Sequence, residues 1–272
     1  MDSFTSSDLR RELSHRNMTR ARDRKHELSY GSIPSVIYEE EEAAHGNFIN
    51  ASYKAICARP EWRRRLEKSY TGGRWIARRW DRVGRSELDC ANSSDALLMN
   101  IFCYPRLLHR RQLCAMLGIE VGVVPEFGVK PHPPLLNGKV DQTEIDMRLG
   151  DVMVEAKLTE TSFRDAPMRL LRRYEDFEEL FDPDDLRMQD DRVCEYQLLR
   201  GILAAYSAGV TFALFCDGRR SDLQESWFRA LQAVRSYSFR SRLKLVTWQE
   251  IAALVPRSLQ KFLEEKYGIV PV

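Results

Sequence analysis

The chain has 272 residues, of which 43% are hydrophobic and 30% charged, and its formal net charge is only +2. A soluble chain of this length buries roughly 70–75% of its unfolded surface, which excludes a disordered chain, a collagen-like repeat and a disulfide scaffold. No apolar run approaches the ~20 residues that a membrane helix needs, and the first eleven residues have no apolar core of a secretory signal. We therefore expect a cytoplasmic protein with no membrane partner.

The cysteines and histidines give no metal signature. None of the six cysteines forms a CxxC pair, so a structural zinc site is not expected. Several of them lie in apolar stretches, which is typical of buried thiols in a reducing compartment. The sequence also has no phosphate-binding loop, no GxGxxG after a strand and no HExxH motif, which argues against the common nucleotide-binding and zinc-protease classes.

The distribution of polar and apolar residues changes along the chain. Residues 1 to about 35 are polar and Arg-rich and read as a loosely ordered arm, and residues 36–90 show short helical patterns. From Ser93 onward the pattern predicts a compact α/β domain, with Ser93 or Ser94 capping its first helix. The sequence thus predicts two regions, a mostly helical or irregular basic extension over residues 1–90 and an α/β domain over residues 91–272.

The elements expected in this domain follow the order α-β-β-β-α-β and then α-β-α, with a mixed central sheet flanked by helices. A second helix carries Leu107 to Leu117 and ends at Gly118. The remaining elements are strands at 121–129, 143–149 and 152–159, a helix at 195–207, a strand at 210–216, a helix at 223–234, a strand at 243–247 and a helix at 258–267.

The strands at 143–149 and 152–159 carry alternating charged and apolar residues. Gly150-Asp151 suits a two-residue hairpin turn with a positive φ at the glycine. This turn pairs Leu149 with Val152, and the same register places Asp146 opposite Glu155. Facing carboxylates need a shared proton or a cation between them, and Mg²⁺ prefers oxygen ligands and keeps waters for a phosphate. Lys157 shares the face of Glu155 and could orient or deprotonate an attacking water or stabilise transition-state charge.

This pattern resembles the PD-(D/E)xK nuclease superfamily, which has the restriction-endonuclease-like fold. The matching residues are Asp146 and the run Glu155-Ala156-Lys157, and Ile145 replaces the proline of the motif. Several segments between residues 90 and 270 also look like a group of uncharacterised bacterial proteins of that fold. The resemblance implies a Mg²⁺ site, with Mn²⁺ as an alternative, formed by Asp146, Glu155 and the Ala156 carbonyl. It further implies a supporting Gln on the following helix, for which Gln197 is the candidate.

Other residues admit two interpretations. Glu160 could join the metal site, although a continuing strand would turn it to the other face, and Glu126 could be a further ligand or a plain strand residue. A helix-dipole or capping role is favoured for Asp95, and a solvated loop position for His132. For the whole charged group, the competing interpretation is a surface network in which Arg148 and Lys157 neutralise the acids.

Charge is concentrated in two blocks. Residues 54–85, the basic block, contain eleven basic and three acidic residues, a net +8, with Tyr and Trp interleaved. Residues 175–191, the acidic block, contain nine acidic residues and one basic residue, a net −8. The basic block is expected to contact nucleic-acid phosphates near the Asp146/Glu155 face, with the acidic block lying elsewhere. The candidate contacts are Arg63, Arg64, Arg74, Arg78 and Arg79.

Together these features predict a Mg²⁺-dependent DNA endonuclease in restriction, defence or repair, with Asp146, Glu155, Lys157 and Gln197 as catalytic residues. RNA remains an alternative substrate, and a homodimer is left open. The competing hypothesis from another class is a catalytically silent nucleic-acid-binding module, and a third hypothesis is a structural α/β protein.

Overall fold

The structure is a computed structural model, which describes residues 4–69 and 84–272. The chain forms two compact units. The sheet unit contains Phe4 and residues 127–247, and the helical unit contains residues from Thr5 to Glu126 and from Trp248 to Val272. The boundary expected at residue 90 falls inside the helical unit. The predicted division into residues 1–90 and 91–272 therefore differs from these two units, and it stays a prediction.

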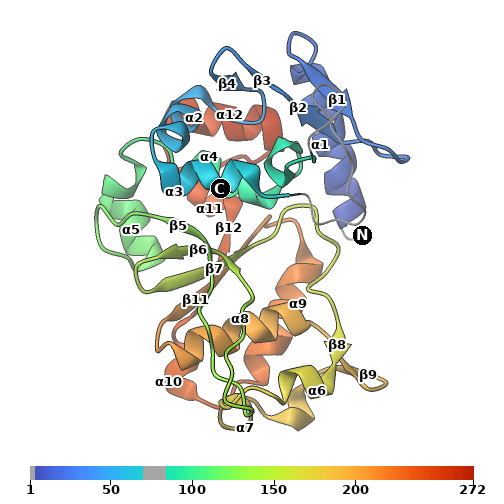
Figure 1. Cartoon of the computed structure of the whole chain (residues 1–272), viewed down its shortest axis with the longest axis vertical. Helices are drawn as coiled ribbons and strands as arrows, with labels where there is room; N and C mark the ends of the chain where they lie inside the picture. Colours follow the sequence, from blue (N-terminus) through green and yellow to red (C-terminus); the bar gives the residue numbers. More distant parts are fainter. Residues whose placement is uncertain (1–3, 70–83) are drawn as a thin grey trace. The chain divides into compact units, whose positions relative to one another are not determined.

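A five-stranded mixed sheet forms the centre of the sheet unit (Figure 1). Its strand order is β12-β11-β7-β6-β5, with β11 parallel to β7 and β12, and β6 antiparallel to β7. The strands are β5 (Glu126–Val129), β6 (Ile145–Leu149), β7 (Val152–Ala156), β11 (Thr211–Cys216) and β12 (Leu243–Thr247). The α/β class and the mixed sheet are confirmed.

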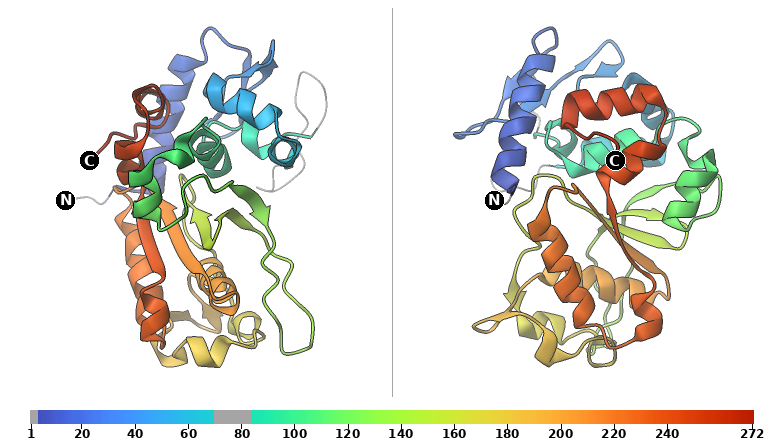
Figure 2. Two further views of the ribbon diagram at one scale, coloured as in Figure 1. Left: turned by 90° about the vertical axis from the view of Figure 1, so that its left-hand side faces the viewer. Right: turned by 180° about the vertical axis from the view of Figure 1, so that it is seen from behind.

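Helices α8 (Tyr196–Ser207) and α9 (Ser221–Gln232) pack against this sheet (Figure 2). Phe212 of β11 shows which face they cover, because its ring stacks on Trp227 of α9 and lies directly beside Gly201 of α8. Shorter elements complete the unit: α6 (Met168–Leu171), α7 (Phe177–Leu180), η4 (Pro183–Asp185), α10 (Tyr237–Arg240) and the small sheet of β8 (Ala166–Pro167), β9 (Met188–Gln189) and β10 (Arg192–Val193).

The helical unit joins both ends of the chain. Helix α1 (Ser6–Arg20) packs against α12 (Arg257–Tyr267), and the blue and red helices lie side by side in Figures 1 and 2. The remaining helices are α2 (Asn50–Cys57), α3 (Pro60–Arg63), α4 (Ser94–Phe102), α5 (Arg111–Leu117) and α11 (Trp248–Leu254), with 3₁₀ turns η1 (Arg64–Glu67), η2 (Glu87–Asp89) and η3 (Leu107–His109). Two short hairpins, β1 (His26–Leu28) with β2 (Val36–Tyr38) and β3 (Glu40–Glu41) with β4 (Ala44–His45), complete it.

The expectation of a loosely ordered arm over residues 1–35 is wrong for the part that forms α1 and β1. Thr5 caps α1 in a capping box with Asp8, and Leu9 and Leu13, one turn apart, are fully buried. Asn17 extends the same stripe and donates from Nδ2 to the Lys266 carbonyl of α12. The helix is strongly polar on average, so its narrow buried stripe gives only a weak periodic signal.

Most predicted elements of the α/β region are present, with changed bounds. Ser93 caps α4, and α5 ends at Gly118, whose φ of 72° is the left-handed C-cap. The strand expected at 121–129 shortens to β5, because Gly122 with φ 85° and the following irregular segment interrupt it. None of the helices in the described part of the chain is long and apolar enough to span a membrane.

Candidate active site

The β6–β7 hairpin has the register that the turn chemistry predicts. Leu149 pairs with Val152 and Met147 with Val154, and Gly150 in the turn has a φ of 58°. A positive φ favours glycine because a Cβ atom would clash with the backbone there. The predicted hairpin and its register are therefore confirmed.

Alternation along these strands places the candidate residues on one face. In β6 the apolar residues are buried and the intervening Asp146 and Arg148 are half-buried, whereas all of β7 is buried. The neighbouring strand β11 pairs Leu214 with Glu155. Because Phe212 and Leu214 share the face covered by α8 and α9, Glu155 points to the same face.

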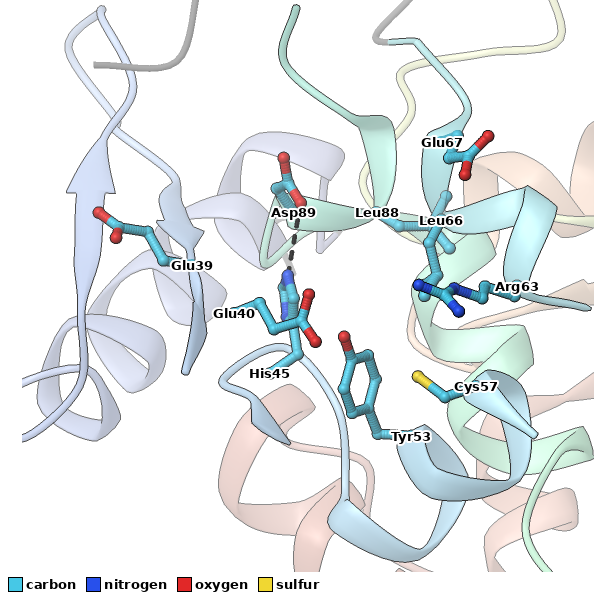
Figure 3. Close-up of a pocket in the computed structure, with 10 residues that line it drawn as sticks. All are labelled: Glu39, Glu40, His45, Tyr53, Cys57, Arg63, Leu66, Glu67, Leu88 and Asp89. Atoms are coloured by element: carbon cyan, nitrogen blue, oxygen red, sulfur yellow. Dashed lines mark hydrogen bonds and ion pairs between the residues drawn. The ribbon is translucent and has the colours of Figure 1, made fainter. Parts of the chain in front are cut away.

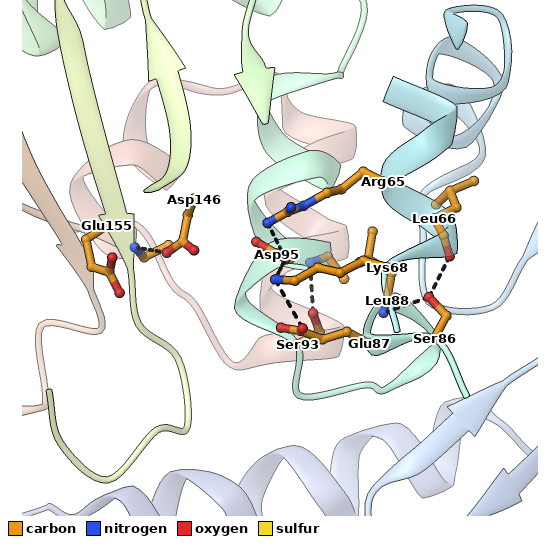
Figure 4. Close-up of polar contacts among 12 residues, drawn as sticks. Arg65, Leu66, Lys68, Ser86, Glu87, Leu88, Ser93, Asp95, Asp146 and Glu155 are labelled. Carbon is orange, nitrogen blue, oxygen red and sulfur yellow. Dashed lines mark hydrogen bonds and ion pairs between the residues drawn. The ribbon is translucent and has the colours of Figure 1, made fainter. Parts of the chain in front are cut away.

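Asp146 lies where the antiparallel pairing of β6 with β7 ends. Backbone pairing between β6 and β7 stops at Met147–Val154, and the Asp146 carboxylate accepts the Ala156 N–H at 2.8 Å (Figure 4). On the other side of β7, the Lys157 N–H donates to the Phe215 carbonyl at 2.8 Å. Strand β7 is thus held on both sides where Glu155 and Lys157 lie, and the Asp146 carboxylate is fixed beside them.

Glu155, Lys157 and Gln197 form a closed set of contacts. The Lys157 ammonium lies 2.9 Å from the Glu155 carboxylate, and both side chains are about 95% buried. Gln197 on the first turn of α8 donates from Nε2 to Glu155 at 2.6 Å and accepts from Lys157 at 2.8 Å. The amide of Gln197 therefore satisfies both charged groups, as buried charges require.

The surroundings of Lys157 keep it protonated. Burial is the largest influence and would lower the pKa of this lysine, but Glu155, Glu160 and Asp146 attract the ammonium and raise its pKa above 10.5. The ammonium also lies 5.4 Å from the centre of the Phe163 ring. Three carboxylates thus act on the one ammonium group of Lys157.

The segment after β7 is fixed by Arg220, which the sequence analysis missed. Arg220 is fully buried and donates to the carbonyls of Leu158 at 3.3 Å and Glu160 at 2.9 Å. It also forms a two-point ion pair with Asp222, with both bonds at 2.8 Å. Only the position of Arg220 shortly after a buried strand could have suggested this role.

Glu160 bends back instead of extending the strand. Its carboxylate accepts the Leu158 N–H at 2.6 Å, and β7 ends at Ala156 rather than at Thr159. Its place in a metal site stays a prediction, although its charge acts on Lys157.

The described residues of the basic block take different positions. Arg63 and Arg64 are exposed, whereas Arg65 is buried and pairs with Asp95 at 3.0 Å (Figure 4). Lys68 contacts Asp95 at 2.6 Å and Glu87 at 3.1 Å, so Asp95 has ion-pair partners in addition to its place in the first turn of α4. Arg74, Arg78 and Arg79 lie outside the described residues.

The remaining candidate ligands lie apart from any cluster. Glu126 in β5 is exposed, and His132 is an exposed loop residue. Within residues 4–69 and 84–272, no three His, Cys, Asp or Glu side chains form a ready metal-binding group. All six cysteines are free, and five of them are buried.

Asp146 and Glu155 nevertheless suit a hard cation. Mg²⁺ usually binds through only one or two carboxylates and keeps several waters, so it does not need three acidic ligands from the protein. Carboxylate oxygens are available from adjacent strands, and the Lys157 ammonium already provides positive charge beside Glu155. The donor set therefore fits Mg²⁺ better than it fits zinc, which prefers Cys and His.

A comparison with known families indicates a restriction-endonuclease-like protein. The family model described as "Restriction Endonuclease associating with ARP" matches residues 15–268, and the chain belongs to that family. No curated protein and no solved structure gives a significant match.

Proposed function

We propose that the chain is a Mg²⁺-dependent DNA endonuclease with a PD-(D/E)xK-type site. The observation that carries the proposal is the convergence of Asp146, Glu155 and Lys157 at the ends of two adjacent strands, with Gln197 bonded to the last two. Apart from the short elements between β7 and α8, the succession α5, β5, β6, β7, α8 and β11 is the order expected for a restriction-endonuclease-like core, which supports the proposal. Family membership supports a nuclease-related role.

Each residue of the proposed active site has its own role. Asp146 and Glu155 offer carboxylate oxygens to Mg²⁺, together with the Ala156 carbonyl. When bound, Mg²⁺ supplies Lewis acidity that polarises the phosphate and activates water. Lys157 lies beside Glu155, where its side chain orients the attacking water or stabilises the developing negative charge. Gln197 orients Glu155 and Lys157.

A cleavage assay tests the proposal. Supercoiled plasmid, linear DNA and a structured RNA are incubated with the protein in a Mg²⁺ or Mn²⁺ titration. We expect plasmid cleavage that requires the metal and falls about a thousandfold in Asp146→Asn or Glu155→Gln protein. Asp151→Asn is the matched control, because Asp151 is exposed in the turn of the same hairpin. Circular dichroism confirms that each variant is folded.

The alternatives give different results. Cleavage of RNA alone would move the assignment to an RNA nuclease. DNA binding without cleavage under any metal condition would favour a silent binding module. Undiminished cleavage in folded Asp146→Asn protein would refute the site.

A further inference from the structure

A cavity of about 310 Å³ lies wholly within the helical unit (Figure 3). Its walls come from the β3–β4 hairpin, α2, the α3–η1 segment and η2. The residues that line it are Glu39, Glu40, His45, Tyr53, Cys57, Arg63, Leu66, Glu67, Leu88 and Asp89. This volume is at the lower end of the range for small-molecule sites, so its occupant is small.

The floor of the cavity is rigid and internally satisfied. His45 accepts the Asn47 N–H at Nδ1, which leaves the proton on Nε2, directed at Asp89 at 3.4 Å. Asp89 uses its other oxygen for the Ser86 N–H. His45 and Tyr53 are buried and their rings pack together, so this floor offers shape and an aromatic surface rather than free charge.

The mouth of the cavity carries exposed charges of both signs. Figure 3 shows Glu40, the Tyr53 hydroxyl and the Arg63 guanidinium directed toward one another. The Tyr53 hydroxyl hydrogen-bonds Glu40, and burial followed by this bond raises the pKa of Tyr53.

These charges restrict the occupant. Four carboxylates against one guanidinium repel a phosphate. A simple ammonium ion has donors only, so it could bind Glu40 but could accept nothing from Arg63. A ligand must therefore present hydrogen-bond donors to Glu40 and acceptors to Arg63. A nucleobase with an amino group does both on one planar edge, since carboxylates accept from such amino groups and Arg donates to base acceptors. Aromatic and apolar surfaces such as Tyr53, Leu66 and Leu88 suit its ring.

We propose that this cavity binds an uncharged, amino-bearing nucleobase or nucleoside, with Glu40 and Arg63 reading its polar edge. The site lies outside the candidate active site, and the proposal does not depend on cleavage. The base could come from a free nucleoside or from an unstacked nucleotide of DNA, and the two sources share this chemistry.

Calorimetric titration of the full-length protein, without Mg²⁺ or cleavable DNA, tests the site. The probes are guanosine, cytidine, adenosine and uridine, the matching 5′-monophosphates, and short single-stranded oligonucleotides. We expect an amino-bearing nucleoside to bind and its monophosphate to bind more weakly. Glu40→Gln and Arg63→Gln should each lose about tenfold or more in affinity, because each removes a charged hydrogen-bond partner.

A neighbouring variant serves as the matched control. Glu42→Gln changes an exposed charge beside Glu40 but outside the cavity, and it should bind the nucleoside unchanged. Stronger binding of the oligonucleotide than of the nucleoside, still dependent on Glu40, would identify DNA as the source. Absence of nucleobase binding in either form, or equal binding by Glu40→Gln protein, would overturn the proposal.

Discussion

Gln197 joins the two charged groups of the candidate site, donating to Glu155 and accepting from Lys157. Gln197→Leu should leave both buried charges with one partner fewer. We expect the free energy of unfolding to fall by about 1–3 kcal/mol and cleavage to slow while its dependence on Mg²⁺ remains. Urea denaturation and the cleavage assay measure the two effects.

Gln197→Glu tests whether Gln197 positions the two charged side chains or only fills space. Its carboxylate would face Glu155 and repel it, but it could still accept from Lys157. A folded Gln197→Glu protein should therefore show a changed Mg²⁺ requirement. An unaltered metal titration in folded Gln197→Glu protein, with an unchanged cleavage rate in Gln197→Leu protein, would contradict the positioning role of Gln197.

Lys266 is fully buried, and no carboxylate among residues 4–69 and 84–272 forms an ion pair with it. Its ammonium nitrogen lies 2.7 Å from the Asn17 side-chain oxygen and 3.3 Å from the Ala91 carbonyl, and the Tyr38 and Tyr267 rings flank it. Burial first, and then the nearby Arg20, lower the pKa of Lys266 well below 10.5.

This lowered pKa predicts a pH dependence of stability. Between the folded pKa of Lys266 and its unfolded value near 10.5, the unfolded chain binds more protons than the folded one. The free energy of unfolding should then rise with pH, by at most about 1.4 kcal/mol per pH unit. Urea denaturation between about pH 7 and 8.5 tests this below the ordinary pKa of the cysteines. Lys266→Met should flatten the slope, and an equal slope in both proteins would contradict the assignment.

At the scale of elements, Gly201 allows α8 to approach β11 closely. A Cβ atom at this position would come within 2.6 Å of the Phe212 ring. Gly201→Ala should therefore lower the free energy of unfolding by about 1–3 kcal/mol, although alanine favours a helix more than glycine does. Thermal and urea denaturation measure the change. Ser207→Ala, at an exposed position of the same helix, should not destabilise, and a stabilised Gly201→Ala protein would show that α8 can move away.

Local and distant interactions explain which elements could be predicted. The β6–β7 hairpin was predictable because its alternation and its Gly150 turn are contained in twelve consecutive residues. The candidate residues Asp146, Glu155 and Lys157 followed from the same segment. Helix α1 was missed because its stripe is buried against α12, which is more than 200 residues away in sequence. Arg220 was missed because its contacts with Leu158 and Glu160 span about 60 residues.

For the whole molecule, the net charge of +2 is the sum of a basic block and an acidic block. In the structure, some cations of the basic block are exposed and others are paired with carboxylates. Lys54, Arg63 and Arg64 are exposed, whereas Arg65 and Lys68 are bound by Asp95 and Glu87. In the acidic block, Asp182 pairs with Arg235 at 3.6 Å. Counting charges along the sequence could locate the basic block, but it could not show which cations have internal partners.

This division predicts different effects for adjacent arginines. If the basic block contacts a nucleic-acid backbone, Lys54→Gln and Arg64→Gln should each weaken DNA binding uniformly across sequences and reduce the salt dependence by about one phosphate contact. Arg65→Gln should instead lower the free energy of unfolding by about 3–5 kcal/mol, because it leaves Asp95 buried with fewer partners. Fluorescence anisotropy with labelled DNA at several salt concentrations, together with urea denaturation, separates the effects. A salt dependence unchanged by the Lys54 and Arg64 substitutions would mean that these exposed cations do not contact DNA, even if the candidate active site cleaves it.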